Sequence, residues 1–70
     1  MIRPEVNDRS RSEWLRLIEE WVHDERDRAI LARHMLDGIT IERLAEEFNL
    51  SVVRTFQIIK RAREQLFRHL

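Results

Sequence analysis

Hydrophobic residues recur at spacings of three and four in four stretches of the chain, and each stretch predicts a helix with one apolar face. The first is expected to begin near Ser10 and to end at about Val22 or His23. Ser10 followed by Glu13 is a capping-box pattern, in which the serine accepts from the backbone and the glutamate reaches back. The apolar positions of this stretch are Trp14, Leu17, Ile18, Trp21 and Val22.

The second predicted helix lies between Asp24 and Gly38. Asp24 can cap its start, and Glu25 and Asp27 suit the positive end of the helix dipole. Gly38 adopts the left-handed conformation that ends many helices without steric cost. The buried stripe is expected to contain Ile30, Leu31, Ala32 and Met35.

The remaining residues predict two helices joined by a tight turn. Thr40 caps a short helix of about eight residues, Asn49 tolerates a left-handed turn, and Ser51 caps a longer helix that runs to about Arg68. Two capped helices around a turn of three or four residues have the spacing of a helix-turn-helix. The inward positions are Ile41, Leu44, Ala45 and Phe48 on the short helix and Thr55, Ile58, Ile59, Ala62 and Leu66 on the long one.

These elements predict an all-α fold of four short helices, with a three-helix helix-turn-helix core and an N-terminal packing helix. Residues 10–70 are expected to form a single domain, with the recognition helix at about 51–68. Residues 1–9 are expected to be flexible, because Pro4 and the Asn7-Asp8 pair discourage a helix start. The chain has one glycine, one proline and no cysteine, so helix packing rather than disulfides must provide its stability.

Charge is unevenly distributed along a chain whose formal net charge is zero. Residues 49–70 carry five Lys or Arg and one Glu, a net of +4, whereas residues 1–48 carry eight Arg and twelve Asp or Glu, a net of −4. A phosphate backbone would attract the basic end. The alternative interpretation is that these charges only solvate the helices.

The outward face of the last helix carries the candidate DNA contacts. Gln57 pairs well with adenine and Arg54 with guanine, and Val53 suits a thymine methyl group. Helix N-termini such as those at Thr40 and Ser51 attract phosphate. We therefore expect base contacts from Val53, Arg54, Gln57 and Arg61. We expect phosphate contacts from Thr40, Arg43, Ser51, Lys60 and Arg68.

Residues 24–68 resemble region 4 of bacterial sigma factors. The segments that carry the resemblance are Arg28-Ala-Ile-Leu, Leu36-Asp-Gly-Ile-Thr-Ile-Glu-Arg-Leu-Ala-Glu-Glu-Phe-Asn-Leu-Ser, Gln57-Ile58 and Ala62. The resemblance implies a DNA-reading helix-turn-helix that recognises an upstream promoter element and touches the flap of RNA polymerase. It also implies that Arg54 and Gln57 belong to the recognition helix, and that Thr40 and Ser51 are its two helix caps.

The chain departs from the pattern of that family at several positions. The family usually has charged residues where this chain has Val52, Val53 and Phe56, and a core Ile or Val where it has Thr55. Arg33 stands where a leucine is common. We therefore expect a target other than the usual promoter sequence. The short chain is similar to stand-alone regulators of phages or mobile elements.

Apolar residues on the last helix leave a second functional class open. Val52, Phe56, Ile59 and Phe67 form an additional apolar stripe. One interpretation is that Phe56 and Phe67 pack against the first helix. The other is that Val52, Phe56 and Phe67 form an exposed patch for a homodimer or a partner protein. In that case the chain is a helical protein-interaction module that does not bind DNA.

Other functions find little support in the sequence. His23, His34 and His69 have no metal-ligand spacing, and the chain has neither a glycine-rich loop nor a catalytic triad pattern. We expect no enzyme activity, cofactor, metal or small-molecule substrate. No run approaches the ~20 apolar residues of a membrane span. The expected setting is cytoplasmic, and the expected partners are double-stranded DNA and RNA polymerase.

Overall fold

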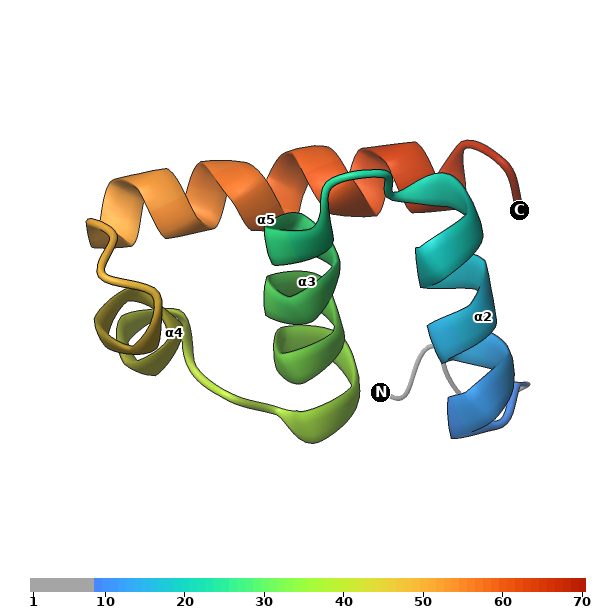
Figure 1. The fold of residues 1–70 in the computed structure, drawn as a ribbon, viewed down its shortest axis with the longest axis horizontal. Helices are drawn as coiled ribbons and strands as arrows, with labels where there is room; N and C mark the ends of the chain where they lie inside the picture. Colours follow the sequence, from blue (N-terminus) through green and yellow to red (C-terminus); the bar gives the residue numbers. More distant parts are fainter. Residues whose placement is uncertain (1–8) are drawn as a thin grey trace, which may run out of the picture.

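The computed structural model describes residues 9–70, which form four α-helices and no strand (Figure 1). The all-α fold is therefore confirmed. The prediction of a flexible segment over residues 1–9 lies almost entirely outside the described residues. The helices are α2 (Arg11–Trp21), α3 (Glu25–Asp37), α4 (Ile41–Glu47) and α5 (Val52–Phe67).

Each helix begins at the cap that its sequence predicts. The side-chain oxygens of Ser10, Asp24, Thr40 and Ser51 each accept a hydrogen bond from the backbone N–H three residues further on. At Ser10 the capping box is complete, because the Glu13 carboxylate also accepts from the Ser10 backbone N–H. These bonds satisfy donors that a helix start otherwise leaves without a partner.

Two residues in the left-handed conformation redirect the chain between helices. Gly38, with φ of 70°, ends α3, and Asn49, with φ of 56°, follows α4. Around Asn49 the Leu50 N–H donates to the Ala45 carbonyl at 2.8 Å, and the Asn49 N–H donates to the Glu46 carbonyl at 3.2 Å. This pair of bonds is a Schellman motif, and it turns the chain sharply into α5.

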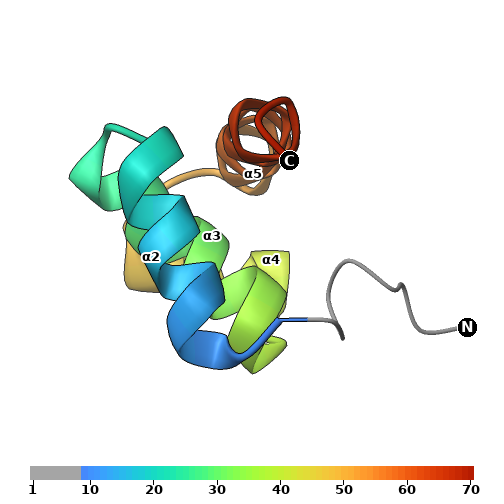
Figure 2. The ribbon, with the colours of Figure 1, turned by 90° about the vertical axis from the view of Figure 1, so that its right-hand side faces the viewer.

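Helix α5 organises the domain by packing against each of the other three helices. It runs along one edge, with α4 beneath its start and α2 and α3 beneath its later turns (Figure 1). Viewed along α5, the other helices lie to one side of it (Figure 2). The opposite side of α5 is therefore left open to a ligand.

The core lies where α2, α3 and α5 meet, and α4 adds Leu44 to it. Its buried members are Trp14, Ile18, Val22, Ile30, Leu31, Leu44, Ile58, Ile59, Ala62 and Leu66. Phe67 sets its ring edge-on against Trp14, with the ring centroids 5.9 Å apart and the planes at 87°. Half-buried Trp21 stacks on His69 with centroids 3.7 Å apart. The prediction that Phe67 packs against the first helix is confirmed.

The matching prediction for Phe56 is wrong. Its side chain is exposed and lies beside His34 and Ile41, away from α2. Phe56 precedes Phe67 by eleven residues, or about 16 Å along a helix. Because α2 crosses the late turns of α5, it reaches Phe67 and not Phe56.

Candidate nucleic-acid interface

The two sides of α5 differ sharply in exposure. Its inward positions, Thr55, Ile58, Ala62 and Leu66, are all buried. Its outward positions, Val53, Arg54, Gln57, Lys60, Arg61 and Glu64, are all exposed. The helix is therefore fixed along one side by the core while its other side meets solvent, as the sequence pattern predicts.

The N-termini of α4 and α5 lie close together beside this outward face. Thr40, Val52 and Val53 line one hollow in the surface, which brings the starts of the two helices to the same place. The hydroxyl of Thr40 accepts from the Arg43 N–H at 3.2 Å, and that of Ser51 accepts from the Arg54 N–H at 3.0 Å. Other N–H groups of each first turn remain available to an anion.

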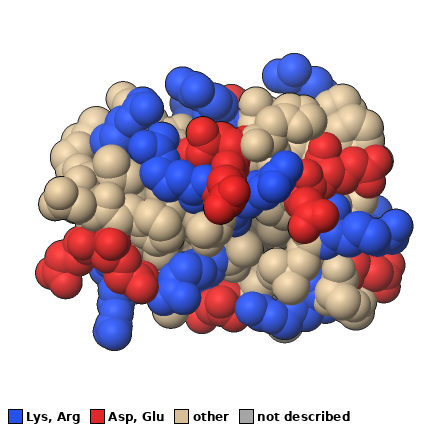
Figure 3. All heavy atoms as spheres, viewed as in Figure 1, with Lys and Arg blue, Asp and Glu red and all other residues tan. Residues whose placement is uncertain are grey.

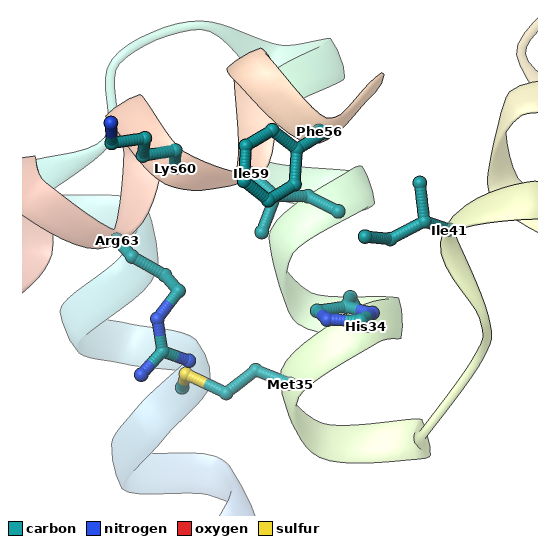
Figure 4. A pocket seen from close by; sticks show the side chains of 7 residues that line it. All are labelled: His34, Met35, Ile41, Phe56, Ile59, Lys60 and Arg63. Carbon is teal, nitrogen blue, oxygen red and sulfur yellow. The ribbon is translucent and has the colours of Figure 1, made fainter. Parts of the chain in front are cut away.

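The hollow continues along α5 as a shallow apolar groove (Figure 4). Phe56 and Ile59 of α5 face Ile41 at the start of α4 and His34 on α3. The His34 ring is held by a 2.8 Å hydrogen bond between its Nδ1 and the Ile39 carbonyl oxygen. The groove is lined by His34, Met35, Ile41, Phe56, Ile59, Lys60 and Arg63. Sequence reasoning did not place His34, Met35 and Ile41 here, because the groove forms only when three helices pack.

Ion pairs among residues 9–70 use arginines of α2 and α3. Arg11 donates to Asp37 at 2.5 Å, and Arg33 donates to Glu47 at 2.8 Å. The Arg11 hydrogen bond holds the pKa of the Asp37 carboxyl below its usual range. The third such pair joins neighbouring residues, Arg26 and Asp27, at 3.4 Å. These ion pairs neutralise arginines in the acidic part of the chain. Arg54, Lys60 and Arg61, the cations on the outward face of α5, take part in none of the three.

Charged side chains on the surface also differ between the region of α5 and that of α4. Lysine and arginine side chains lie along the edge where α5 runs, and a group of acidic side chains lies over α4 (Figure 3). Arg54, Lys60 and Arg61 belong to the outward face of α5 and are exposed. The outward face of α5 thus carries three exposed cations and one exposed carboxylate, that of Glu64.

The structure gathers some of the predicted contact residues and separates others. Val53, Arg54, Gln57, Lys60 and Arg61 share the outward face of α5. Thr40 and Ser51 begin α4 and α5, and Arg43 is exposed on α4.

Two predicted residues lie at the other end of α5. Arg68 follows Arg54 by fourteen residues, or about 21 Å along the helix. Phe67 is half-buried against Trp14, so it does not form one patch with Val52 and Phe56. The predicted patch of Val52, Phe56 and Phe67 is therefore divided, because α2 covers only the late turns of α5.

Comparison with known proteins places this arrangement in a family. The family model for Sigma-70, region 4 matches residues 24–68, which is more than half of the chain and includes α3, α4 and α5. The chain belongs to the sigma-70 region 4 family. Region 4 domains are DNA-binding helix-turn-helix domains, and they also bind RNA polymerase. No curated protein and no solved structure matched the chain.

Within the region 4 domain, α4, the turn at Asn49 and α5 are the helix-turn-helix. Helix α2 precedes the matched residues and packs on α3 and α5. Residues 9–70 include no helix that is both long and apolar enough to cross a membrane. In the same residues, no three His, Asp or Glu side chains are grouped as a metal site would require.

Proposed function

We propose that this region 4 domain is a transcription regulator that binds double-stranded DNA sequence-specifically, with α5 in the major groove. The observation that carries the proposal is the outward face of α5, where Arg54 and Gln57 are exposed on a helix whose other side is buried. Arginine pairs in bidentate fashion with guanine, and glutamine with adenine. Arg61 follows one turn after Gln57 and extends this readout.

Phosphate contacts would fix the position of α5 in the groove. The N-termini of α4 and α5 point N–H groups outward beside Thr40 and Ser51, and Arg43 and Lys60 add positive charge near them. Arg68 would reach a phosphate further along the duplex. In this arrangement the backbone contacts orient the domain and the side chains of α5 read the bases.

Salt dependence provides the first test. Fluorescence anisotropy is measured with a mixed-sequence duplex of about two helical turns, at salt from about 50 to about 200 mM. Three cationic phosphate contacts, from Arg43, Lys60 and Arg68, predict a loss of affinity of about fortyfold over that range. Arg54→Ala and Gln57→Ala should each weaken binding to a selected target by ~1–3 kcal/mol.

Arg16→Ala is the matched control. It removes one exposed positive charge from α2, away from the outward face of α5, and should leave affinity nearly unchanged. The absence of binding at sub-millimolar duplex and low salt would refute the proposal. Equal losses for Arg16→Ala and Arg54→Ala would refute the assignment of the face.

The second candidate function is a helical protein-interaction module, and the exposed Val52, Val53 and Phe56 favour it. Its partner would be RNA polymerase or a second copy of the chain. A homodimer would also let DNA binding span two half-sites. If this function is correct, Phe56→Ala or Val53→Asp should abolish the interaction, and salt should matter little. Either function fits a protein of the cytoplasm.

A further inference from the structure

We propose that the first turns of α5 read the C5-methyl groups of thymines in the major groove. The inference rests on the proposed function and names the class of base that the domain selects. The residues concerned are Val52, Val53 and Phe56, here called the apolar tip. Their exposed fractions are 47%, 66% and 52%.

The apolar tip is placed where a helix-turn-helix meets base edges. All three residues lie in the first five positions of α5, directly after the Ser51 cap. Recognition helices present their N-terminal residues to the bases. The tip also adjoins Thr40 at the start of α4 and follows directly on the N-terminus of α5, which favours phosphate. A duplex held at the start of α5 would cover the tip.

Thymine is the base that suits such a surface. In the major groove it presents a methyl group beside its O4 acceptor, whereas guanine, adenine and cytosine present no methyl group. Valine and phenylalanine side chains cannot form hydrogen bonds with the polar groups of a base edge, so those groups would lose water without compensation. The tip therefore favours thymine, the base that offers it an apolar contact. Arg54 and Gln57, interleaved with the tip, would read the neighbouring purines.

A second copy of the chain fits the tip less well. A standard protein interface buries about 800 Å² on each partner and involves about 20–30 residues. The tip has three residues, and the exposed side chains beside it on α5 include the cations Arg54 and Lys60. In an interface with a second copy these cations would face one another or lose their water. Facing a duplex, the same cations would meet phosphates.

The test removes only the methyl groups from the DNA. Two duplexes of about two helical turns are compared by fluorescence anisotropy, one of alternating dA and dT and the other with every dT replaced by dU. The replacement keeps the hydrogen-bonding pattern of each pair. We expect the dU duplex to bind about fourfold more weakly for each methyl group that the tip covers.

Variants test whether the apolar tip causes the difference in affinity between the dT and dU duplexes. Val52→Thr with Val53→Thr keeps the side-chain shape and puts a hydroxyl in place of a methyl. This double variant should show a smaller preference for the dT duplex, because only Phe56 and the threonine methyl groups remain to contact thymine. Leu70→Thr is the control, because Leu70 is also about half exposed but lies beyond the C-terminal end of α5, and it should keep the preference for dT. Thermal melting followed by circular dichroism confirms that each variant is folded.

Each result is decisive. A preference for dT that the double variant reduces supports the proposal, and a preference that it leaves unchanged overturns the assignment to Val52 and Val53. Equal binding of the two duplexes by the unaltered chain overturns it while leaving DNA binding intact. Failure to bind these and a mixed-sequence duplex overturns the proposed function itself. A dimer in sedimentation that the double variant converts to a monomer would overturn the thymine assignment in favour of self-association.

Discussion

Replacing Thr55 by valine should leave the stability of the domain nearly unchanged, although the threonine is fully buried and hydrogen-bonded. Its hydroxyl donates to the Ser51 carbonyl at 2.8 Å, and the Thr55 backbone N–H donates to the same oxygen at 2.9 Å. The side-chain bond is therefore additional to the normal helical bond. Valine keeps the shape of the side chain and loses only the hydroxyl.

The expected balance follows from these contacts. Losing the side-chain hydrogen bond costs about 1 kcal/mol, a net figure that already includes the desolvation of the hydroxyl. The Ser51 carbonyl keeps its backbone partner, so no buried polar atom is orphaned. The added methyl contributes about 0.8 kcal/mol in the opposite direction. We therefore expect the free energy of unfolding to change by less than about 0.5 kcal/mol.

Thermal unfolding by circular dichroism measures the effect. The Tm of a domain of this size changes by about 4–8 °C per kcal/mol, so Thr55→Val should move the Tm by less than about 4 °C. Thr55→Ser keeps the hydroxyl but removes a buried methyl group, and it should destabilise the domain by about 1 kcal/mol. A fall in Tm of more than about 4 °C for Thr55→Val would refute the reasoning. It would mean that the hydroxyl shapes the start of α5 in a way that packing alone does not replace.

Three further predictions concern the turns and caps. Ser51→Ala removes the acceptor of the Arg54 N–H and should lower the free energy of unfolding by about 1 kcal/mol in urea titrations. Asn49→Ala should cost about 1 kcal/mol because of the left-handed φ, whereas Asn49→Gly should change stability by no more than about 0.5 kcal/mol; equal effects would contradict this. The pKa of Asp24 lies below its usual value of 3.8 because its carboxylate accepts from the Asp27 N–H, and that of Asp37 is lowered by Arg11. Both groups therefore stabilise the fold above about pH 4, and this stability is lost as the pH falls through the lowered values. Asp24→Asn keeps a capping side chain and should flatten the acid limb of a Tm-against-pH curve. An unchanged acid limb would rule out that contribution.

Local chemistry made most of the fold predictable. A cap is decided by a few neighbouring residues, so Ser10, Thr40 and Ser51 could be identified from the sequence alone. The inward side of α5 was predictable for a similar reason, because a period of 3.6 residues fixes which side chains share a face. Asn49 completed the helix-turn-helix, since few residues other than glycine accept its conformation.

Long-range geometry was not predictable in the same way. Arg33 and Glu47 are fourteen positions apart, and their ion pair depends on how α3 meets α4. The positions of Phe56 and Phe67 depend on where α2 crosses α5, which periodicity does not specify. On a helical wheel Phe56 and Phe67 belong to one apolar stripe, yet only Phe67 contacts an aromatic residue of α2, Trp14. The apolar groove and the apolar tip follow from that crossing point.

The zero net charge of the chain is compatible with DNA binding because the charges are separated in the fold. In the described part of the chain, Asp27 and Asp37 of α3 and Glu47 of α4 form ion pairs with arginines of α2 and α3. The outward face of α5 keeps its positive charge and the two helix N-termini beside it. A domain with this arrangement would gain less from non-specific phosphate attraction than a uniformly basic one. It must obtain more of its affinity from base contacts, so apolar contact with thymine methyl groups would account for a larger share of its binding.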